Sequence, residues 1–177
     1  MKLYGAPPTR AIRVQWLLNE LGIECEVVGV NPVDPGPDFP ALNPAGKLPA
    51  LVDGDVVMTE SAAIPLYLAE KYPEKGLIPK GLVDRAQMYR WIFFLVTEIE
   101  QPLWRIALNT TIYPAEIRVP ADIANATHDC KKMIAVFEQH MTDRAVVAGD
   151  QRAPASPQPV DSERERERQR KMKDGIW

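Results

Sequence analysis

Two short apolar segments flank an amphipathic helical pattern at the start of the chain, and this order constrains the fold more than any other feature. Residues 2–4 have the pattern of a short strand that stops at Gly5. From Thr9 onward, apolar residues recur with helical spacing until Gly22. The recurring residues are Val14, Leu17, Leu18 and Leu21. Residues 25–30 then supply a second strand pattern, so the order predicts a right-handed crossover between parallel strands.

A proline-rich stretch and a hairpin pattern follow. Residues 31–44 contain five prolines, which are too many for a regular helix, so we expect a shaped loop there. Two strand patterns, at 49–52 and 56–58, are separated by an Asp-Gly pair that is typical of a hairpin turn. Ser61 then caps a predicted helix. This order of elements predicts an α/β domain of the thioredoxin type over residues 1–75.

Residues 82–150 carry helical patterns only. Apolar residues spaced by three and four predict one long helix at 82–109, with Pro102 as a kink, and a second at 120–141. Residues 76–81 are interpreted as the linker to this partial all-helical C-terminal domain. Two such helices cannot bury both apolar stripes alone. We therefore expect them to need the α/β domain, further helices or a partner subunit.

The last segment of the chain differs in composition from the rest. Residues 151–177 hold seven basic and five acidic residues, a net charge of +2, whereas residues 1–150 hold 14 basic and 19 acidic residues, a net charge of −5. Its prolines and alternating Glu and Arg residues supply too little apolar surface to offset the entropy lost on ordering. We therefore expect a disordered or solvated charged tail and an incomplete helical domain.

Composition excludes several classes of protein. The 177-residue chain has a net charge of −3, which argues against nucleic-acid and membrane-surface partners. Two cysteines, Cys25 and Cys130, exclude a disulfide scaffold. Neither His128 nor His140 has metal-ligand spacing with a cysteine or carboxylate cluster, so no metal site is expected. Because residues 1–20 lack a secretory signal and no stretch has the length of a membrane span, we expect a cytoplasmic protein.

Thr9 is the first candidate functional residue, because it lies at the N-terminus of the first predicted helix. Free backbone N–H groups and the positive end of the helix dipole favour an anion at such a position. A hydroxyl donor there would stabilise a thiolate and lower its pKa. The alternative is that Thr9 only caps the helix.

Two further segments present groups that suit a peptide-like ligand. A cis bond before Pro49 would leave the backbone of Leu48 free to pair with an extended peptide, with Lys47 near a carboxylate. Ser61, at the N-terminus of the next helix, would bind a carboxylate, and Glu60 an ammonium group. The alternatives are a strand-entry proline beside a surface lysine and a simple helix cap. Together the three sites indicate a ligand with a peptide-like centre, carboxylates, an amino group and a thiol.

The order and spacing of these motifs resemble cytosolic glutathione S-transferases, in particular the bacterial, serine- or threonine-type, theta-like branch. The motifs that carry the resemblance are Leu3-Tyr4-Gly5, Pro8-Thr9-Arg10, Asn43-Pro44, Gly46-Lys47-Leu48-Pro49-Ala50-Leu51 and Glu60-Ser61. The resemblance covers residues 1–150 and implies a thioredoxin-like domain followed by an all-helical domain. It also implies a detoxifying transferase that conjugates the thiolate of glutathione to a hydrophobic electrophile, as a homodimer without a metal. The family pattern continues into further apolar helices where this chain does not, so the helical domain is expected to be truncated.

The resemblance assigns a role to each candidate residue. It places Thr9 as the group that stabilises the thiolate, where serine-type members have a serine, and Tyr4 as its rival, because other branches use a tyrosine near the end of the first strand. Tyr4 lies within the predicted strand, so we favour Thr9. The residues that the resemblance assigns to glutathione binding are Lys47, Leu48, Pro49, Glu60 and Ser61.

Two other interpretations of the sequence stay open. One is a non-catalytic glutathione transferase-like module that binds a protein partner, and the other is an inactive truncated paralogue. The nearly complete glutathione site favours the enzyme, whereas exposed apolar stripes on 82–109 and 120–141 favour the binding module. The sequence does not identify the electrophile.

Overall fold

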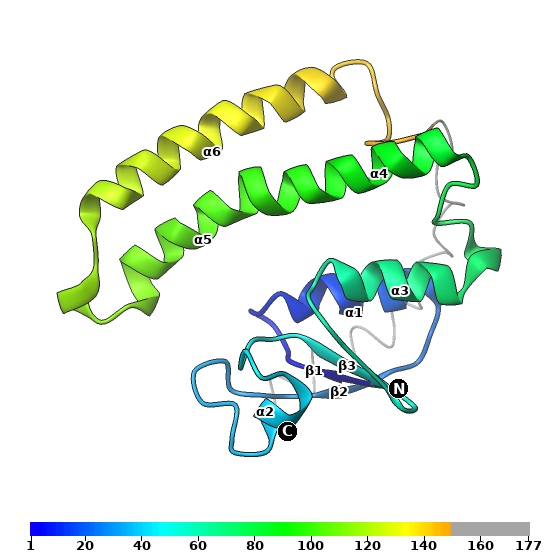
Figure 1. The fold of residues 1–177 in the computed structure, drawn as a ribbon, viewed down its shortest axis with the longest axis horizontal. Coiled ribbons are helices and arrows are strands. Elements are labelled where there is room, and N and C mark those ends of the chain that lie inside the picture. Colours follow the sequence, from blue (N-terminus) through cyan, green and yellow to red (C-terminus); the bar gives the residue numbers. More distant parts are fainter. Residues whose placement is uncertain (150–177) are drawn as a thin grey trace, which may run out of the picture. The chain divides into compact units, whose positions relative to one another are not determined.

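A computed structural model describes residues 1–149 of the chain. These residues group into two compact units, Met1–Leu68 and a second unit that begins at Ala69 (Figure 1). The predicted charged tail at 151–177 lies outside the described residues. The predicted linker at 76–81 stays a prediction. No helix among the described residues is both long and apolar enough to cross a membrane.

The first unit is built on a four-stranded mixed sheet. In the spatial order β2-β1-β3-β4, its strands are β1 (Lys2–Tyr4), β2 (Glu26–Val28), β3 (Ala50–Asp53) and β4 (Val56–Thr59). The pair β1–β2 is parallel, and the pairs β1–β3 and β3–β4 are antiparallel. Leu3 in the middle of β1 lies opposite Val27 and Leu51. The predicted crossover and hairpin are therefore confirmed, and so is the thioredoxin-like fold class.

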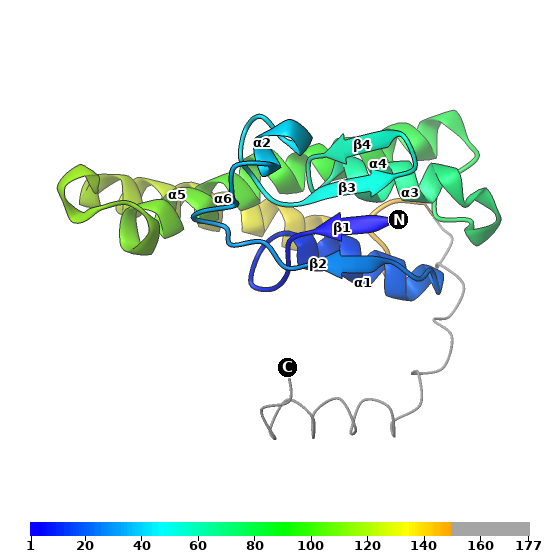
Figure 2. The same ribbon diagram turned by 90° about the horizontal axis from the view of Figure 1, so that it is seen from below.

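Two helices cover one face of this sheet and a shorter helix lies on the other (Figures 1 and 2). The helices are α1 (Ala11–Leu21) and α3 (Ala63–Lys71) on one face, and α2 (Phe39–Leu42) on the other. α1 ends where Gly22 adopts a φ of +69°, and the N–H of Gly22 donates to the carbonyl of Asn19 at 3.0 Å. The fully buried side chains of this unit include Leu3, Val14, Leu18, Leu51, Ile64 and Leu68.

The helix α2 lies inside the stretch that was predicted to be a loop without regular structure. The prediction was wrong over these four residues. Pro40 lies in the first turn of α2, where a missing N–H removes no hydrogen bond, so proline is tolerated there. The turn buries Phe39, which contacts the ring of Tyr4 with 6.3 Å between centroids.

The second unit is helical, as predicted. Its elements are η1 (Pro73–Lys75), α4 (Leu82–Phe94), η2 (Leu95–Glu100), α5 (Gln101–Ala107), η3 (Leu108–Ile112), η4 (Ala115–Ile117) and α6 (Pro120–Met141). The segments η2 and η3 are π-helical, so α4 to η3 form one long helix with two wider turns. Pro102 is the second residue of α5, which follows η2, and because proline has no N–H, the wider turn before it accommodates the lost hydrogen bond.

The helical unit buries few large side chains. Trp91 is 3% exposed, and its ring contacts those of Phe137 and His140 with centroids 5.6 and 3.9 Å apart. By contrast, Phe93 is 64% and Leu103 51% exposed. The long helices therefore leave apolar residues on the surface of this unit, as their sequence pattern predicts.

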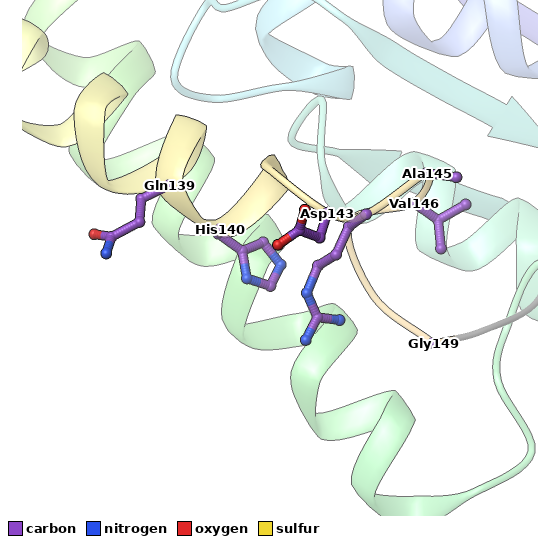
Figure 3. Close-up of a pocket in the computed structure, with 7 residues that line it drawn as sticks. Gln139, His140, Asp143, Ala145, Val146 and Gly149 are labelled. Carbon is purple, nitrogen blue, oxygen red and sulfur yellow. The ribbon is translucent and has the colours of Figure 1, made fainter.

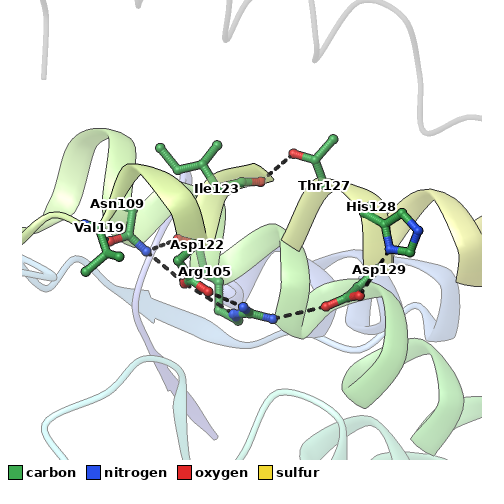
Figure 4. A network of polar contacts seen from close by, with 8 residues as sticks. All are labelled: Arg105, Asn109, Val119, Asp122, Ile123, Thr127, His128 and Asp129. Atoms are coloured by element: carbon green, nitrogen blue, oxygen red, sulfur yellow. Dashed lines mark hydrogen bonds and ion pairs between the residues drawn. The ribbon is translucent and has the colours of Figure 1, made fainter. Parts of the chain in front are cut away.

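A polar network joins α5 and η3 to the start of α6 (Figure 4). The guanidinium of Arg105 forms ion pairs with the carboxylates of Asp122 and Asp129. The amide of Asn109, only 7% exposed, donates to the Asp122 carboxylate at 3.1 Å and accepts from the N–H of Val119 at 2.8 Å. Because Val119 is the N-cap residue of α6, this network ties the beginning of that helix to the preceding one.

We expect Asp122→Asn to reduce the acid sensitivity of the fold. The hydrogen bond from Arg105 holds the pKa of the Asp122 carboxyl below its usual range. A carboxyl whose pKa is lowered in the folded state stabilises the fold above its unfolded pKa, near 4, and loses that contribution as the pH falls through the lowered value. Thermal melts followed by circular dichroism from about pH 7 to about pH 3 should therefore show a smaller fall in Tm for the variant. Equal falls in the two proteins would contradict this account.

Candidate functional site

Gly5, directly after β1, brings two of the predicted site segments together. Its φ is +114°, a conformation that favours glycine. A Cβ at this position would lie 3.3 Å from the Thr9 hydroxyl oxygen, 3.3 Å from the Cβ of Leu48 and 3.1 Å from the Cβ of Ala11. Thr9 and Leu48 therefore flank the same glycine, although 39 positions separate them in the chain.

The Thr9 hydroxyl has a hydrogen-bond partner on each side. It donates to the carbonyl of Ala6 at 2.7 Å and accepts from the N–H of Ala11 at 3.3 Å. α1 begins at Ala11, and Arg10 occupies the N-cap position. Thr9 thus lies one residue before the position expected for a cap, and its oxygen still satisfies an N–H of the first turn. Its role toward a thiolate stays a prediction.

The loop before β3 presents the backbone of Leu48. The Leu48–Pro49 bond is cis, as the resemblance implies, and the Pro49 side chain is fully buried. The amide of Asn43, itself 7% exposed, donates to the carbonyl of Lys47 at 2.6 Å and accepts from the N–H of Ala45 at 3.1 Å. Within residues 1–149, the backbone of Leu48 makes no hydrogen bond. Lys47 is exposed beside it.

A second cluster lies where β4 passes into α3. Glu60 is exposed and has a φ of +70°, a strained conformation for a residue with a side chain, and such strain is typical of functional sites. Ser61 is 9% exposed, and its hydroxyl oxygen accepts from the Arg13 guanidinium at 3.2 Å. Within the described chain no N–H of α3 donates to Ser61, so the predicted capping bond is absent. The N–H of Ile64 donates instead to the carbonyl of Glu60 at 3.0 Å.

Helix α1 connects the two clusters. Thr9 precedes it beside Gly5 and Leu48, and Arg13, one turn further on, contacts Ser61. Neither Arg13 nor Asn43 is among the residues that the sequence predicted to form the site. The Asn-Pro pair at 43–44 is a turn signal that pointed to Asn43. No local pattern predicts the contact that Arg13 makes, because its partner Ser61 lies 48 residues away in the sequence.

Tyr4 and Cys25 are placed differently from Thr9. The Tyr4 ring packs on Phe39 of α2, whereas its neighbour Leu3 is completely buried and projects to the opposite face of the sheet. Tyr4 therefore faces the side of α2, away from α1. Burial raises the pKa of the Cys25 thiol, so this cysteine is protonated at neutral pH and is a weak nucleophile. Among residues 1–149, no group of three or more His, Cys, Asp or Glu side chains is placed to hold a metal ion.

A cavity of about 580 Å³ in the helical unit shares no residue with these clusters (Figure 3). Its lining residues are Gln139, His140, Asp143, Arg144, Ala145, Val146 and Gly149. His140 Nε2 lies 2.8 Å from the carbonyl oxygen of Val147 and its ring stacks on Trp91. These contacts hold the segment after α6 in place. None of the predicted site residues lines this cavity.

Comparison with known proteins relates most of the chain to one family. A family model described as "Glutathione S-transferase, N-terminal domain" matches residues 3–76, which include every candidate residue from Tyr4 to Ser61. Glutathione S-transferase 3 of Zea mays is 33% identical over 164 residues, which are 85% of this chain and 71% of that protein. Glutathione S-transferase F10 of Arabidopsis thaliana is 33% identical over 141 residues, 75% of this chain and 65% of that protein.

A solved structure gives the same result at the level of the fold. The theta class glutathione S-transferase from Xanthomonas axonopodis pv. citri, determined with glutathione bound, has a TM-score of 0.74 to this chain at 26% identity. The match covers 86% of this chain and 75% of that one.

We expect Gly5→Ala to destabilise the first unit more than Gly22→Ala does. Both glycines have positive φ values, so both variants carry backbone strain of about 1 kcal/mol or more. Only at Gly5 would the new Cβ also press on neighbouring atoms, because no atom lies within 4 Å of a Cβ placed at Gly22. Urea unfolding of both variants measures the difference. Equal losses of unfolding free energy would show that the close packing around Gly5 has no energetic weight.

Proposed function

Because this chain belongs to the glutathione S-transferase family, we propose that it binds glutathione and conjugates the glutathione thiolate to a small hydrophobic electrophile. The observation that supports the proposal is that the Thr9 turn and the Leu48 loop both lie against Gly5. It places a hydroxyl group beside a backbone segment that makes no hydrogen bond within the described chain. A thiol-containing peptide that pairs with Leu48 would bring its sulfur toward Thr9.

In this proposal Thr9 stabilises the thiolate. Its proton is donated to the neutral Ala6 carbonyl, and on binding it would turn to the charged sulfur. Hydrogen bonds to charged acceptors are about twice as strong as those between neutral groups, so the exchange favours the thiolate. The positive end of the α1 dipole acts in the same direction. Both effects lower the pKa of the bound thiol, and the rate then comes from the thiolate population and from proximity to the electrophile.

The other candidate residues anchor the rest of the tripeptide. The backbone of Leu48, held in place by the buried Pro49, would pair with the cysteinyl residue in the manner of an added strand. The exposed Lys47 would meet the glycyl carboxylate. Ser61 would bind the carboxylate of the γ-glutamyl group, and Glu60 its ammonium group.

We further propose that the chain is a theta-like member of the serine- or threonine-type branch. Thr9 retains the hydroxyl group of that branch, and a theta class structure is among its structural relatives. A bacterial origin and a cytoplasmic location stay predictions. A homodimer would give partners to apolar residues that are exposed in the single chain, such as Phe93 and Leu103.

Binding is tested on immobilised glutathione. We expect the full chain to be retained and to be eluted by free glutathione, and to conjugate glutathione to a dinitrobenzene electrophile. Passage through the column without retention would contradict the proposal. Retention without conjugation of any electrophile would support instead the non-catalytic binding module.

The role of Thr9 is tested by Thr9→Ala, with Thr9→Ser and Tyr4→Phe as controls. Loss of one hydrogen bond to a charged group should lower kcat/KM about 10- to 100-fold and leave the Kd for glutathione nearly unchanged. The apparent pKa in the pH–rate profile should rise, because the thiolate loses a donor. Thr9→Ser and Tyr4→Phe should retain activity. A large loss in Tyr4→Phe together with an active Thr9→Ala would reject Thr9 in favour of its rival.

A further inference from the structure

We propose that the outer face of α1 is a self-association surface, on which two copies of the chain pack α1 against α1 in antiparallel orientation. The surface consists of Ile12, Trp16 and Asn19, which together are called the α1 stripe. It lies in the first unit, whereas the homodimer proposed for this chain would cover Phe93 and Leu103 of the second unit. The inference is therefore independent of glutathione binding.

The α1 stripe exposes two large apolar side chains that the core of the first unit does not use. Trp16 is 67% and Ile12 is 54% exposed, and the two residues lie one helical turn apart. The buried residues of α1 occupy the opposite face of the helix; they are Ala11, Val14, Leu18 and Leu21. Tryptophan buries a large area and is enriched where protein interfaces contribute most to affinity. The stripe is therefore suited to a protein partner.

The spacing of the α1 stripe makes it complementary to a second copy of itself. Ile12, Trp16 and Asn19 lie at positions i, i+4 and i+7, which line one face of a helix. Trp16 is near the middle of the stripe. A second copy turned end for end therefore places Trp16 against Trp16 and Ile12 against Asn19. The same patch is used on both copies, as in a two-fold symmetric interface.

The charges of α1 favour the antiparallel orientation over the parallel one. Arg10 and Arg13 lie near its N-terminal end and Glu20 lies near its C-terminal end. When Ile12 lies opposite Asn19 of the other copy, Glu20 lies opposite position 11, between the two arginines. The opposed helix dipoles act in the same direction. In a parallel pair, by contrast, like charges and like dipole ends would meet.

The size of the stripe sets the affinity that we expect. One eleven-residue helix from each copy buries less than the total of about 1,200 Å² at which stable protein interfaces begin. Interfaces of this size are typical of transient complexes. We therefore expect a dissociation constant on the order of 10 μM, so that the association depends on concentration over an accessible range.

Sedimentation velocity of the full chain from about 1 to about 300 μM measures this association. We expect Trp16→Glu, which places a charge at the centre of the stripe, to raise the dissociation constant at least about tenfold. Val33→Glu is the matched control, because Val33 is an exposed apolar residue of the same unit, and it should behave as the wild type does. If circular dichroism shows that Trp16→Glu has lost helix, Ile12→Lys makes the same test.

The surface of the second unit is separated from the α1 stripe by a further variant. Phe93→Glu combined with Leu103→Glu places charges on the surface that the proposed homodimer would cover. The step that Trp16→Glu weakens should persist in this double variant, since the stripe is unchanged. Loss of that step in the double variant would show that the second unit, and not α1, forms the contact.

Cysteine pairing tests the orientation of the two helices. In a Cys25→Ser background, a mixture of the Ile12→Cys and Asn19→Cys variants should form an interchain disulfide, because these positions face each other. Each variant alone should cross-link slowly, since equal positions lie about 10 Å apart along the helix axis, too far for a disulfide. Glu20→Lys should weaken the association severalfold, because it brings a like charge to the arginines of the other copy.

The outcomes decide the inference without involving the glutathione site. Equal masses for the wild type and Trp16→Glu at every concentration, whether monomeric or larger, would overturn it. A wild type that is monomeric throughout would assign the stripe to further chain or to a different protein. Cross-linking of each cysteine variant mainly with itself would overturn the antiparallel orientation. Retention on immobilised glutathione tests the proposed function separately, so either can fail while the other stands.

Discussion

The close approach of two loops across Gly5 is the constraint on which the candidate site depends. A glycine directly after β1 allows the Thr9 hydroxyl oxygen and the Cβ of Leu48 to lie each 3.3 Å from the place that a Cβ would occupy at Gly5. Because Gly5 continues a strand at the centre of the sheet, the position of both loops is set by the best-packed part of the molecule. The site is therefore held by the core of the first unit rather than by the loops alone.

Local signals in the sequence predicted most of the first unit, and tertiary contacts account for what they missed. The strand at 2–4, the helix end at Gly22 and the Asp-Gly hairpin each depend on neighbouring residues, and each is confirmed. The turn of α2 was not predicted because proline is excluded from helix interiors but not from a first turn. The bond between Arg13 and Ser61 depends on how two helices pack on the sheet, which no periodic pattern encodes.

The two units differ in what holds them together. The first unit buries a continuous set of large aliphatic side chains between its sheet and two helices. The second depends on the ring cluster around Trp91 and on the polar network of Arg105, Asn109 and Asp122, and it leaves large apolar residues exposed. The candidate glutathione-binding residues all lie in the better-packed unit. The exposed apolar surface of the second unit is suited to contact with a partner subunit or with further helices.

The central claim, that the first unit carries the glutathione site, is tested most directly by nuclear magnetic resonance. The isotope-labelled chain is titrated with glutathione while its backbone amide signals are followed. We predict that the largest shift changes occur at Leu48, at Ser61 and in the turn that contains Thr9, with little change along α6. Changes confined to the cavity beside His140, or no change at the Leu48 amide at saturating glutathione, would contradict the account.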